Sequence, residues 1–366
     1  MKVLVVADQW PWPPHQGDRV RLAAVCEVLS DKHQVTVLGT PSEREPADTA
    51  NLSAMPLKVS KRSINLIRFP TVPIAVALRM NREIRRTVTT LSLEYDRILF
   101  YHLKTTAWLD SSVPSAKVLI DLTDSLGLYY RRRSGFIWQF EASRVLRWER
   151  HLAQHYAVSV CSDHDRSAID PNERYGITIS PNGYWQPPSW ERLPEPSSVI
   201  VVGNWNYYPN RSGLSKFLDE VWNRVRGKNK KAILFVVGRG PNPVRHPMEG
   251  VQWIGEVDDL GLWYRKAWLA VGPVYVGAGM KTKIVEALFY GVPVVATRFA
   301  TEGIEPNPML LSVPDDGPEA FANAILTEFT QRRRWTEPLR TEFIRRNNWQ
   351  STLAPLMNVM DRGESS

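Results

Sequence analysis

The sequence predicts an α/β protein made of two doubly wound, Rossmann-like domains that face each other across a cleft. The first observation is that short apolar runs alternate along the chain with segments of helical spacing. The second is a proline-rich stretch at residues 181–196, after which the alternation starts again. A length of 366 residues agrees, because one domain has about 100–200 residues.

Composition excludes several protein classes and favours an anionic partner. Hydrophobic residues make up 43% of the chain and charged residues 23%, which excludes a largely disordered or collagen-like protein. The 46 basic residues exceed the 38 acidic residues, so the formal charge is +8. This excess favours nucleic acid, nucleotide phosphates or an acidic membrane surface as partner, and does not choose among them.

Cysteine content and the N-terminus indicate a cytoplasmic protein. Cys26 and Cys161 are too few for a disulfide framework or a four-cysteine zinc site, so we expect buried thiols in a reducing compartment. The first residues lack the apolar stretch and cleavage site of a signal peptide. No apolar run approaches the roughly 18–20 residues of a membrane span, and peripheral attachment at the inner face of the membrane stays open.

The first half opens with a strand, a helix and a second strand. Residues 3–7 form an apolar run typical of a buried parallel strand, and residues 35–38 form the next. Between them Leu22, Val25, Cys26 and Leu29 have helical spacing. Further strands are predicted at residues 98–101, 118–120 and 158–161, with a long Arg-rich helix over residues 131–155.

The second half repeats this pattern. A helix is predicted over residues 214–225, and strands at residues 198–202, 233–237, 251–254, 269–274 and 292–296. In such folds ligands lie at the carboxyl ends of the strands, so the loops that follow strands are the candidate sites. The domains are therefore predicted to span residues 1–185 and 186–345.

The most informative segment runs from Gly277 to Leu288. Two glycines, Gly277 and Gly279, allow close approach of a ligand just before a helix whose N–H groups attract phosphate. Lys281 and Lys283 add positive charge there, and Glu286 lies within the first two turns, within reach of a ribose. This layout predicts a nucleotide-diphosphate site. The alternative is a solvated helix start with ordinary Lys–Glu pairing.

This segment resembles the nucleotide-sugar half of glycosyltransferases of the GT-B fold, in particular the retaining glycosyl transferases group 1. The similarity covers nearly the whole chain. It continues through residues 200–203, 208–210, 237–240, 253–255, 258–260 and 301–304, and through residues 13–19, 33–38, 121–125 and 181–183. The resemblance implies metal-independent transfer without a cofactor, and a helix over residues 346–366 that returns to the first domain.

The resemblance also implies donor-binding roles for matching residues. Glu286 matches the second carboxylate of the family's paired-Glu motif and would hold the ribose hydroxyls. The first Glu is replaced by Ala278, so the backbone and side chains that follow would take up the donor contacts. These residues are Gly279, Met280, Lys281, Thr282 and Lys283.

A second departure concerns the diphosphate. Many relatives place Arg and Lys after the first strand of this half, whereas this chain has Gly203 followed by neutral residues. Lys281 and Lys283 would then carry more of the phosphate charge, with Lys283 preferred as the catalytic cation. Gly203 would let the backbone approach the donor. Arg239 would face the base or the diphosphate, or would be an ordinary surface arginine.

In the first half, the resemblance places Gly17 where the family's glycine loop approaches the donor phosphate, and Arg19 follows it. Asp124, just past a strand end, is the candidate catalytic residue near the reacting sugar, with Asp121 as the competitor. The alternative is that Asp124 or Thr123 only caps the next helix.

Asp163-His164-Asp165 could suggest a divalent metal, because two carboxylates are separated by one residue. The segment follows a strand and precedes a helical pattern, so helix capping is the favoured interpretation. Since the family resemblance implies a metal-independent reaction, no metal ligand is predicted.

Arg131, Arg132 and Arg133 begin the most basic stretch of the chain, which continues with arginines interleaved with aromatic residues. One interpretation is binding of an anionic acceptor, such as a lipid-linked sugar phosphate at a membrane surface. No nucleic-acid recognition module is visible, so nucleic acid is not expected. The other interpretation is a long amphipathic helix whose solvated arginines pair with Glu141 and Glu149.

These observations predict a glycosyltransferase that moves a sugar from a nucleoside diphosphate donor to a hydroxyl acceptor. The acceptor would be a glycan, a lipid-linked molecule or a small molecule, in cell-envelope or exopolysaccharide assembly. A non-catalytic nucleotide-sugar-binding protein and a sugar-nucleotide epimerase of the same fold stay open. A dehydrogenase is disfavoured, since no Gly-x-Gly-x-x-Gly follows the first strand.

Overall fold

The computed structural model describes residues 1–14, 17–42, 50–57, 72–185, 191–244, 246–315, 317–331 and 333–362. The chain divides into two compact units. Unit 1 comprises Met1–Asn182 and Trp349–Ser366, and unit 2 comprises Gly183–Asn348. The sequence placed the boundary at residues 185/186 and the returning segment at residues 346–366.

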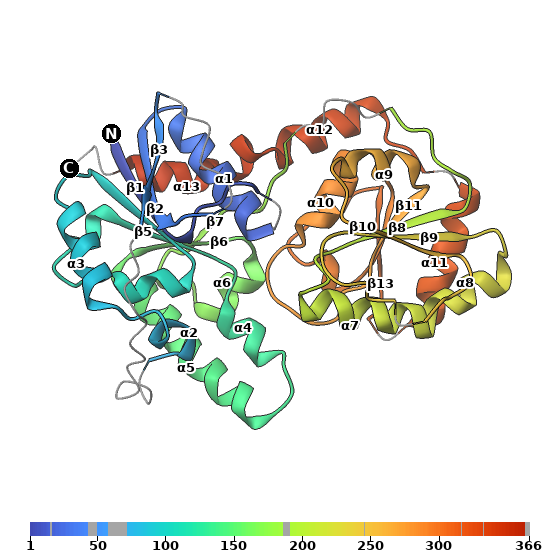
Figure 1. The fold of residues 1–366 in the computed structure, drawn as a ribbon, viewed down its shortest axis with the longest axis horizontal. Coiled ribbons are helices and arrows are strands. Elements are labelled where there is room, and N and C mark those ends of the chain that lie inside the picture. Colours follow the sequence, from blue (N-terminus) through green and yellow to red (C-terminus); the bar gives the residue numbers. More distant parts are fainter. Residues whose placement is uncertain are drawn as a thin grey trace. The chain divides into compact units, whose positions relative to one another are not determined.

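Unit 1 is built on a seven-stranded parallel sheet of order β3-β2-β1-β4-β5-β6-β7 (Figure 1). The strands are β1 (Lys2–Gln9), β2 (Gln34–Thr40), β3 (Leu52–Pro56), β4 (Arg97–Tyr101), β5 (Val118–Thr123), β6 (Ala157–Val160) and β7 (Thr178–Ile179). The apolar run Val3–Ala7 in β1 is fully buried, as expected for a central parallel strand with helices on both faces.

The helices of unit 1 lie between its successive parallel strands, except for α13 (Trp349–Asp361), which is the last element of the chain. They are α1 (Gly17–Ser30), α2 (Ile74–Ala77), α3 (Arg82–Leu91), α4 (Leu126–Arg131), α5 (Phe136–His155), α6 (Asp163–Ile169) and α13 (Trp349–Asp361), with 3₁₀ turns at Leu103–Trp108 and Ser115–Lys117. Helix α13 packs against α1 and β7, and the Ser180 hydroxyl donates to the carbonyl of Thr352 at 2.9 Å. The last helix of the chain therefore belongs to the first unit.

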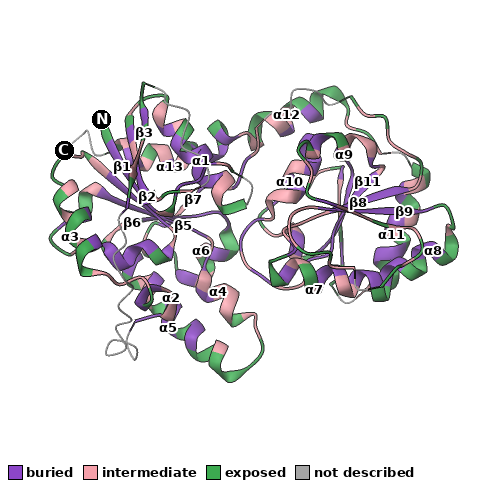
Figure 2. Ribbon diagram, viewed as in Figure 1, coloured by how far each residue is buried: buried purple, intermediate pink, exposed green. Residues whose placement is uncertain are grey.

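Unit 2 has a six-stranded parallel sheet of order β10-β9-β8-β11-β12-β13. The strands are β8 (Ser198–Val202), β9 (Ile233–Val237), β10 (Val251–Gly255), β11 (Leu269–Gly272), β12 (Val294–Thr297) and β13 (Leu310–Val313). The helices are α7 (Tyr208–Phe217), a π turn (Leu218–Trp222), α8 (Asn223–Lys228), α9 (Leu260–Lys266), α10 (Thr282–Phe289), α11 (Pro318–Gln331) and α12 (Glu337–Asn347), with a 3₁₀ turn at Phe299–Thr301. The central strands of both sheets are largely buried, whereas the edge strands β3, β7, β10 and β13 are mostly half-buried or exposed (Figure 2).

The structure confirms most predicted strands and corrects one helix. The predicted long helix over residues 131–155 is confirmed from Phe136 to His155 as α5, but it is interrupted at residues 132–135, because α4 ends at Arg131. Gly135 between them has φ 108°, a backbone angle that an α-helix excludes. Strands β3, β7 and β13 were not predicted; β7 has only two residues, too few for a pattern.

Two further sequence observations bear on the fold. Cys26 and Cys161 are buried thiols that form no disulfide, and their burial was predicted. Among the helices of the described residues, none is long and apolar enough to cross a bilayer.

Helix α7 lies unusually close to the chain after β11, which gives a test of packing in unit 2. A Cβ atom added at Gly213 would lie 1.9 Å from the carbonyl oxygen of Pro273, so one of the two backbones would have to move. We expect Gly213→Ala to lower the free energy of unfolding by about 1–3 kcal/mol, measured by urea denaturation. Gly227→Ala in α8 is the matched control, because nothing lies within 4 Å of its added Cβ, and it should gain up to about 1 kcal/mol. Equal stability of the two variants would contradict this packing.

Candidate functional site

In unit 2, the loops that follow β8 and β9 are in direct backbone contact. The N–H of Gly203 donates to the carbonyl of Val237 at 3.1 Å. Gly238 has φ 129°, and a Cβ there would lie 2.0 Å from the carbonyl oxygen of Gly203. Only glycine fits at position 238. The backbones that follow the carboxyl ends of these two strands therefore lie directly against each other.

The predicted helix start is present in the structure as α10, which begins at Thr282. The loop before it requires glycine, because Gly277 has φ 142° and Gly279 has φ 70°. No side chain caps the helix, whose N-cap residue is Lys281. The first N–H groups of α10 are therefore left for water or an anionic ligand.

The two predicted phosphate-binding lysines make different contacts. The ammonium of Lys283 donates to Asn210 Oδ1 at 3.0 Å, and the Asn210 amide donates to the carbonyl of Asn204 at 3.0 Å. Lys281 instead donates to the carbonyls of its own loop, at 3.1 Å for Ala278 and 2.5 Å for Gly279. Lys283 thus reaches across to the segment after β8, whereas Lys281 folds back.

The pKa of Lys283 is lower than that of an ordinary lysine. Burial, and then the positive charge of Lys281, lower the pKa of Lys283 to about 8. A bound diphosphate would reverse this effect, since an adjacent anion favours the charged ammonium.

Glu286 is held by two tyrosine hydroxyls that the sequence analysis did not single out. The Tyr184 hydroxyl donates to Oε1 at 2.5 Å, and the Tyr264 hydroxyl donates to Oε2 at 3.2 Å. Burial raises the pKa of Glu286 to about 7, although both hydrogen bonds favour the ionised form. Near neutral pH this carboxyl is therefore divided between its protonated and ionised forms.

Tyr184 is fixed by both its backbone and its ring. Its N–H donates to the carbonyl of Asn347 at 3.0 Å, and it forms a parallel β-bridge with Asn348. Its ring contacts the edges of Phe289 and Tyr290, with centroids 5.6 Å and 6.2 Å apart. Tyr184 is 163 positions from Asn347, so no local sequence pattern could reveal this contact.

Arg239 lies on the loop after β9, beside the segment that contains Gly203. Its carbonyl accepts from the N–H of Trp205 at 2.7 Å, and its guanidinium Nε lies 3.9 Å from a carboxylate oxygen of Glu256. The side chain is 39% exposed.

In unit 1, the predicted residues Gly17 and Arg19 follow β1. Gly17 is the first residue of α1 and is exposed. The Arg19 guanidinium donates to Gln9 Oε1 at 2.6 Å, at the end of β1. The Tyr101 hydroxyl donates to the carbonyl of Asp18 at 2.6 Å and so ties the start of α1 to the end of β4.

Two residues with left-handed backbone follow β4 and end β5. His102 has φ 68° and Thr123 has φ 64°, and His102 Nδ1 lies 3.1 Å from the Thr123 hydroxyl. That hydroxyl also donates to Asp124 Oδ1 at 3.0 Å. Such a backbone costs about 1–3 kcal/mol at a residue that is not glycine, and it gathers at functional sites. His102 is a candidate site residue that the sequence analysis missed, although it directly follows a predicted strand.

The structure gives the contacts of Asp124 and of the residues around it. Ser125, rather than Asp124 or Thr123, caps α4, because its side chain accepts from the N–H of Leu128 at 3.0 Å. The capping interpretation is therefore wrong. The competitor Asp121 is fully buried and pairs with Arg21 at 3.0 Å, so its charge is already compensated. Asp124 is partly exposed beside Thr123.

Buried carboxylates support the loop behind Asp124. Asp165 Oδ1 accepts from the N–H of Ser125 at 2.9 Å, and Glu149 Oε2 accepts from the Ser125 hydroxyl at 2.7 Å. Burial raises the pKa of Glu149 to about 8. The expectation that Glu149 pairs with the solvated arginines of the long helix is therefore wrong.

The Asp163-His164-Asp165 segment opens α6, which Ser162 caps by accepting from the N–H of Asp165. Asp163 pairs with Arg166 at 2.6 Å, and the side chain of Asp165 accepts from the Ser125 N–H and the Ser162 hydroxyl. These contacts account for both carboxylates within the fold.

The three predicted acceptor-binding arginines lie where α4 ends. Arg131 is the last residue of α4, and Arg132 and Arg133 follow in the turn before α5. The expected pairing of Glu141 occurs with Arg144, at 2.8 Å, but both side chains are buried rather than on a solvated face.

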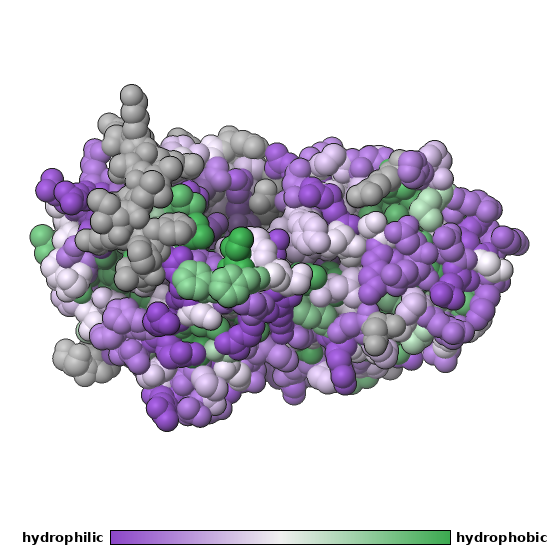
Figure 3. All heavy atoms as spheres, turned by 90° about the horizontal axis from the view of Figure 1, so that it is seen from below, coloured by the Kyte–Doolittle hydropathy of each residue, from purple (hydrophilic) through white to green (hydrophobic). Residues whose placement is uncertain are grey.

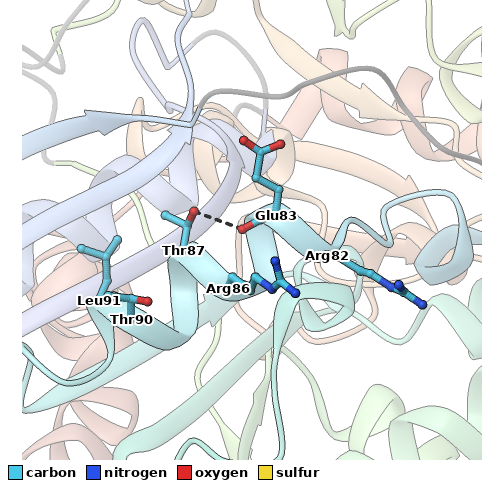
Figure 4. A pocket seen from close by; sticks show the side chains of 6 residues that line it. All are labelled: Arg82, Glu83, Arg86, Thr87, Thr90 and Leu91. Atoms are coloured by element: carbon cyan, nitrogen blue, oxygen red, sulfur yellow. Dashed lines mark hydrogen bonds between the residues drawn. The ribbon is translucent and has the colours of Figure 1, made fainter.

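A hollow on the surface of unit 1 lies along α3 (Figure 4). Its lining residues are Arg82, Glu83, Arg86, Thr87, Thr90 and Leu91. All belong to one helix, and no predicted site residue is among them.

Part of unit 2 is similar to a known protein family. Residues 196–330 match the family model of glycosyl transferases group 1. The matched region contains β8, β9, the loop after β11 and α10, which carry the donor-site candidates. The chain matches no curated protein sequence.

Solved structures share the fold of the whole chain. Sucrose-phosphate synthase from Thermosynechococcus elongatus is 15% identical, with a TM-score of 0.72 over 99% of this chain and 98% of the other. WaaG, a glycosyltransferase involved in lipopolysaccharide biosynthesis, is 14% identical, with a TM-score of 0.62 over 99% and 97%. Anabaena Alr3699/HepE, solved with UDP and glucose, is 16% identical, with a TM-score of 0.61 over 99% and 98%. The chain therefore has the GT-B fold.

The tyrosine contacts of Glu286 can be tested by titration. Tyr184→Phe removes one hydrogen bond to the ionised carboxylate, so the pKa of Glu286 should rise above about 7. Carbon-13 NMR of labelled glutamate side chains measures it, with Glu286→Gln to assign the signal and exposed Tyr208→Phe as control. A Glu286 signal that titrates near its ordinary value of 4.5 in the wild type would contradict the site geometry.

Proposed function

We propose that the protein transfers a sugar from a nucleoside diphosphate donor to a hydroxyl acceptor. The observation that carries the proposal is the uncapped N-terminus of α10, with Lys283 and Glu286 on its first two turns. The group 1 match over residues 196–330 supports it, as does the presence of UDP in the similar Anabaena protein.

The difficult step in such a transfer is the build-up of negative charge on the departing diphosphate. Lys283 and the first N–H groups of α10 would stabilise that charge, because preorganised donors act strongly in a partly buried site. Thr282 is the first residue of the helix, and Gly279 and Met280 lie in the loop just before it. Lys281 would contribute after leaving the carbonyls of its own loop.

Glu286 would hold the ribose of the donor. An ionised carboxylate accepts two hydrogen bonds, which matches the two neighbouring ribose hydroxyls. In the structure two tyrosine hydroxyls occupy these acceptor positions. The ribose would compete with them or reach the remaining lone pairs. Gly203 and Arg239 would contact the donor from the loops after β8 and β9.

For unit 1 we propose that Asp124 acts on the reacting sugar and that Gly17 and Arg19 contact the donor phosphate. The strained Thr123 and its hydrogen bond to Asp124 support a functional role for this loop. We further propose that the reaction retains the sugar's configuration and needs no metal ion, because lysines and helix N–H groups supply the positive charge.

We propose cell-envelope or exopolysaccharide glycans as the acceptor class, in the cytoplasm. WaaG, which has a similar fold, is involved in lipopolysaccharide biosynthesis, and this supports the proposal. The acceptor would be a hydroxyl of a glycan, a lipid-linked molecule or a small molecule.

A donor screen tests the proposal. Purified protein is incubated with radiolabelled UDP-, GDP- and ADP-sugars, with and without envelope glycan acceptors, and the released nucleotide is measured. Hydrolysis or transfer from one donor is expected. Binding without release of the nucleotide would instead indicate a non-catalytic nucleotide-sugar-binding protein, and conversion to an isomeric sugar would indicate an epimerase.

We expect Lys283→Ala to weaken binding of the identified nucleotide sugar by about 10–100-fold, since a charge-assisted hydrogen bond contributes about 1.5–3 kcal/mol. Lys281→Ala should weaken binding less. Calorimetry gives the affinities, and Lys228→Ala, whose ammonium contacts Asn323 at 3.0 Å, is the matched control. Unchanged affinity in Lys283→Ala would exclude the diphosphate role.

The affinity should also depend on pH. Ionised Glu286 accepts the ribose hydroxyls, so affinity should fall as the pH drops below about 7. Charged Lys283 binds the diphosphate, so affinity should fall as the pH rises well above about 8, the free-state pKa. Glu286→Gln should remove the acidic fall only. A flat wild-type profile between pH 5.5 and 7.5 would exclude the ribose role.

Metal independence has a separate test. Transfer should persist after exhaustive treatment with EDTA, because the proposed charge stabilisation comes from protein groups. If EDTA treatment instead abolished activity, and manganese then restored the activity while metal-free buffer did not, this part of the proposal would be overturned.

A further inference from the structure

Three large apolar side chains on the first turns of α5 face solvent. Phe136 is 84% exposed, Ile137 is 73% exposed and Phe140 is 54% exposed. Their positions i, i+1 and i+4 place them on one face of the helix. Scattered apolar residues are ordinary on a surface, but an adjacent group next to charged residues indicates an interaction site.

The segment before this apolar face is basic. Arg131, Arg132 and Arg133 lie between the end of α4 and the start of α5. The Arg133 guanidinium lies 3.7 Å from the centroid of the Trp138 ring. Arg131 is exposed, and Arg132 and Arg133 are half-buried. Glu141, on α5, is buried and paired with Arg144.

The basic segment is held in place beside the apolar face. The Gln139 side-chain amide donates to the carbonyl of Arg131 at 3.0 Å and to that of Arg133 at 2.8 Å. Helices α4 and α5 also pack along each other. The arginines and the apolar side chains therefore form one preorganised surface, which we call the α4–α5 tip, consisting of residues 131–133, 136, 137 and 140.

The tip is convex. The turn between α4 and α5 projects from the rest of unit 1 (Figure 1). Seen from below, apolar side chains stand out beside strongly hydrophilic ones on this side of unit 1 (Figure 3). A projecting apolar group with a cationic margin fits a soft planar surface better than it fits a folded partner, which would need a matching hollow.

We propose that the α4–α5 tip docks on a bilayer that contains anionic phospholipids. Phe136, Ile137 and Phe140 would enter the boundary between headgroups and acyl chains, and the arginines would bind lipid phosphates. Each arginine near such a surface adds electrostatic attraction to the lipid phosphates, and the three apolar side chains add the burial of their surface. The two contributions together favour reversible attachment. The inference does not depend on the proposed transferase activity.

Vesicle co-sedimentation of the full chain tests the proposal. Vesicles of phosphatidylcholine alone are compared with vesicles that contain one quarter phosphatidylglycerol. We expect binding to the anionic vesicles to exceed binding to neutral vesicles at least tenfold and to weaken as salt is raised, because the charges are exposed. Equal binding to both vesicles, or no binding to either, would overturn the proposal.

Two variants separate the apolar and basic contributions. Phe136→Ser/Ile137→Ser/Phe140→Ser and Arg131→Ala/Arg132→Ala/Arg133→Ala should each reduce binding to anionic vesicles at least tenfold. Matched controls on unit 1 are Leu93→Ser, at a leucine 80% exposed, and Arg82→Ala/Arg86→Ala on α3, both expected to bind as wild type. Unfolding midpoints check that every variant folds.

Three outcomes would count against the bilayer. Equal loss of binding in the control variants would show that vesicle binding depends on the general surface charge of the protein and not on the tip. A dimer in sedimentation velocity that the serine variant dissociates would assign the tip to a second copy of the chain. Binding of a soluble sugar phosphate that the arginine variant abolishes, without vesicle binding, would assign it to an acceptor.

Discussion

The start of α10 is the constraint on which the candidate site of unit 2 depends. The helix can begin where it does only because Gly277 and Gly279 adopt left-handed backbone, which turns the chain from β11 into the helix. Once the helix begins at Thr282, Lys283 and Glu286 fall one turn apart and reach opposite neighbours, Asn210 on α7 and the tyrosine hydroxyls. The cation, the first N–H groups and the carboxylate are thus all supplied by residues 282–286.

The candidate site of unit 1 differs from that of unit 2, because it contains residues with a strained backbone. His102 and Thr123 keep left-handed angles although neither is glycine, and their side chains bond to each other. Buried support from Asp165 and Glu149 fixes Ser125 behind them, so the loop that carries Asp124 is held from within. In both units the polar groups follow the carboxyl ends of parallel strands, where helices and loops leave backbone groups open to a ligand.

The sequence predicted features that repeat locally and missed those that depend on distant contacts. Buried strands such as residues 198–202 and 233–237 match the structure, because an apolar run is a local signal. The α10 start was predictable because glycine, lysine and glutamate stand within ten residues. The tyrosine contacts of Glu286 were not, since Tyr184 lies 102 positions away. The break at Gly135 was hidden because arginines and aromatics kept helical spacing across it.

The most direct test of the central claim is a crystal structure with the nucleotide diphosphate of the preferred donor bound. We predict the diphosphate at the N-terminus of α10, within hydrogen-bond distance of Lys283 Nζ and the first N–H groups of the helix, with the ribose hydroxyls on Glu286. A nucleotide bound elsewhere in the chain, with Lys283 still on Asn210 and Glu286 still on both tyrosines, would contradict the account.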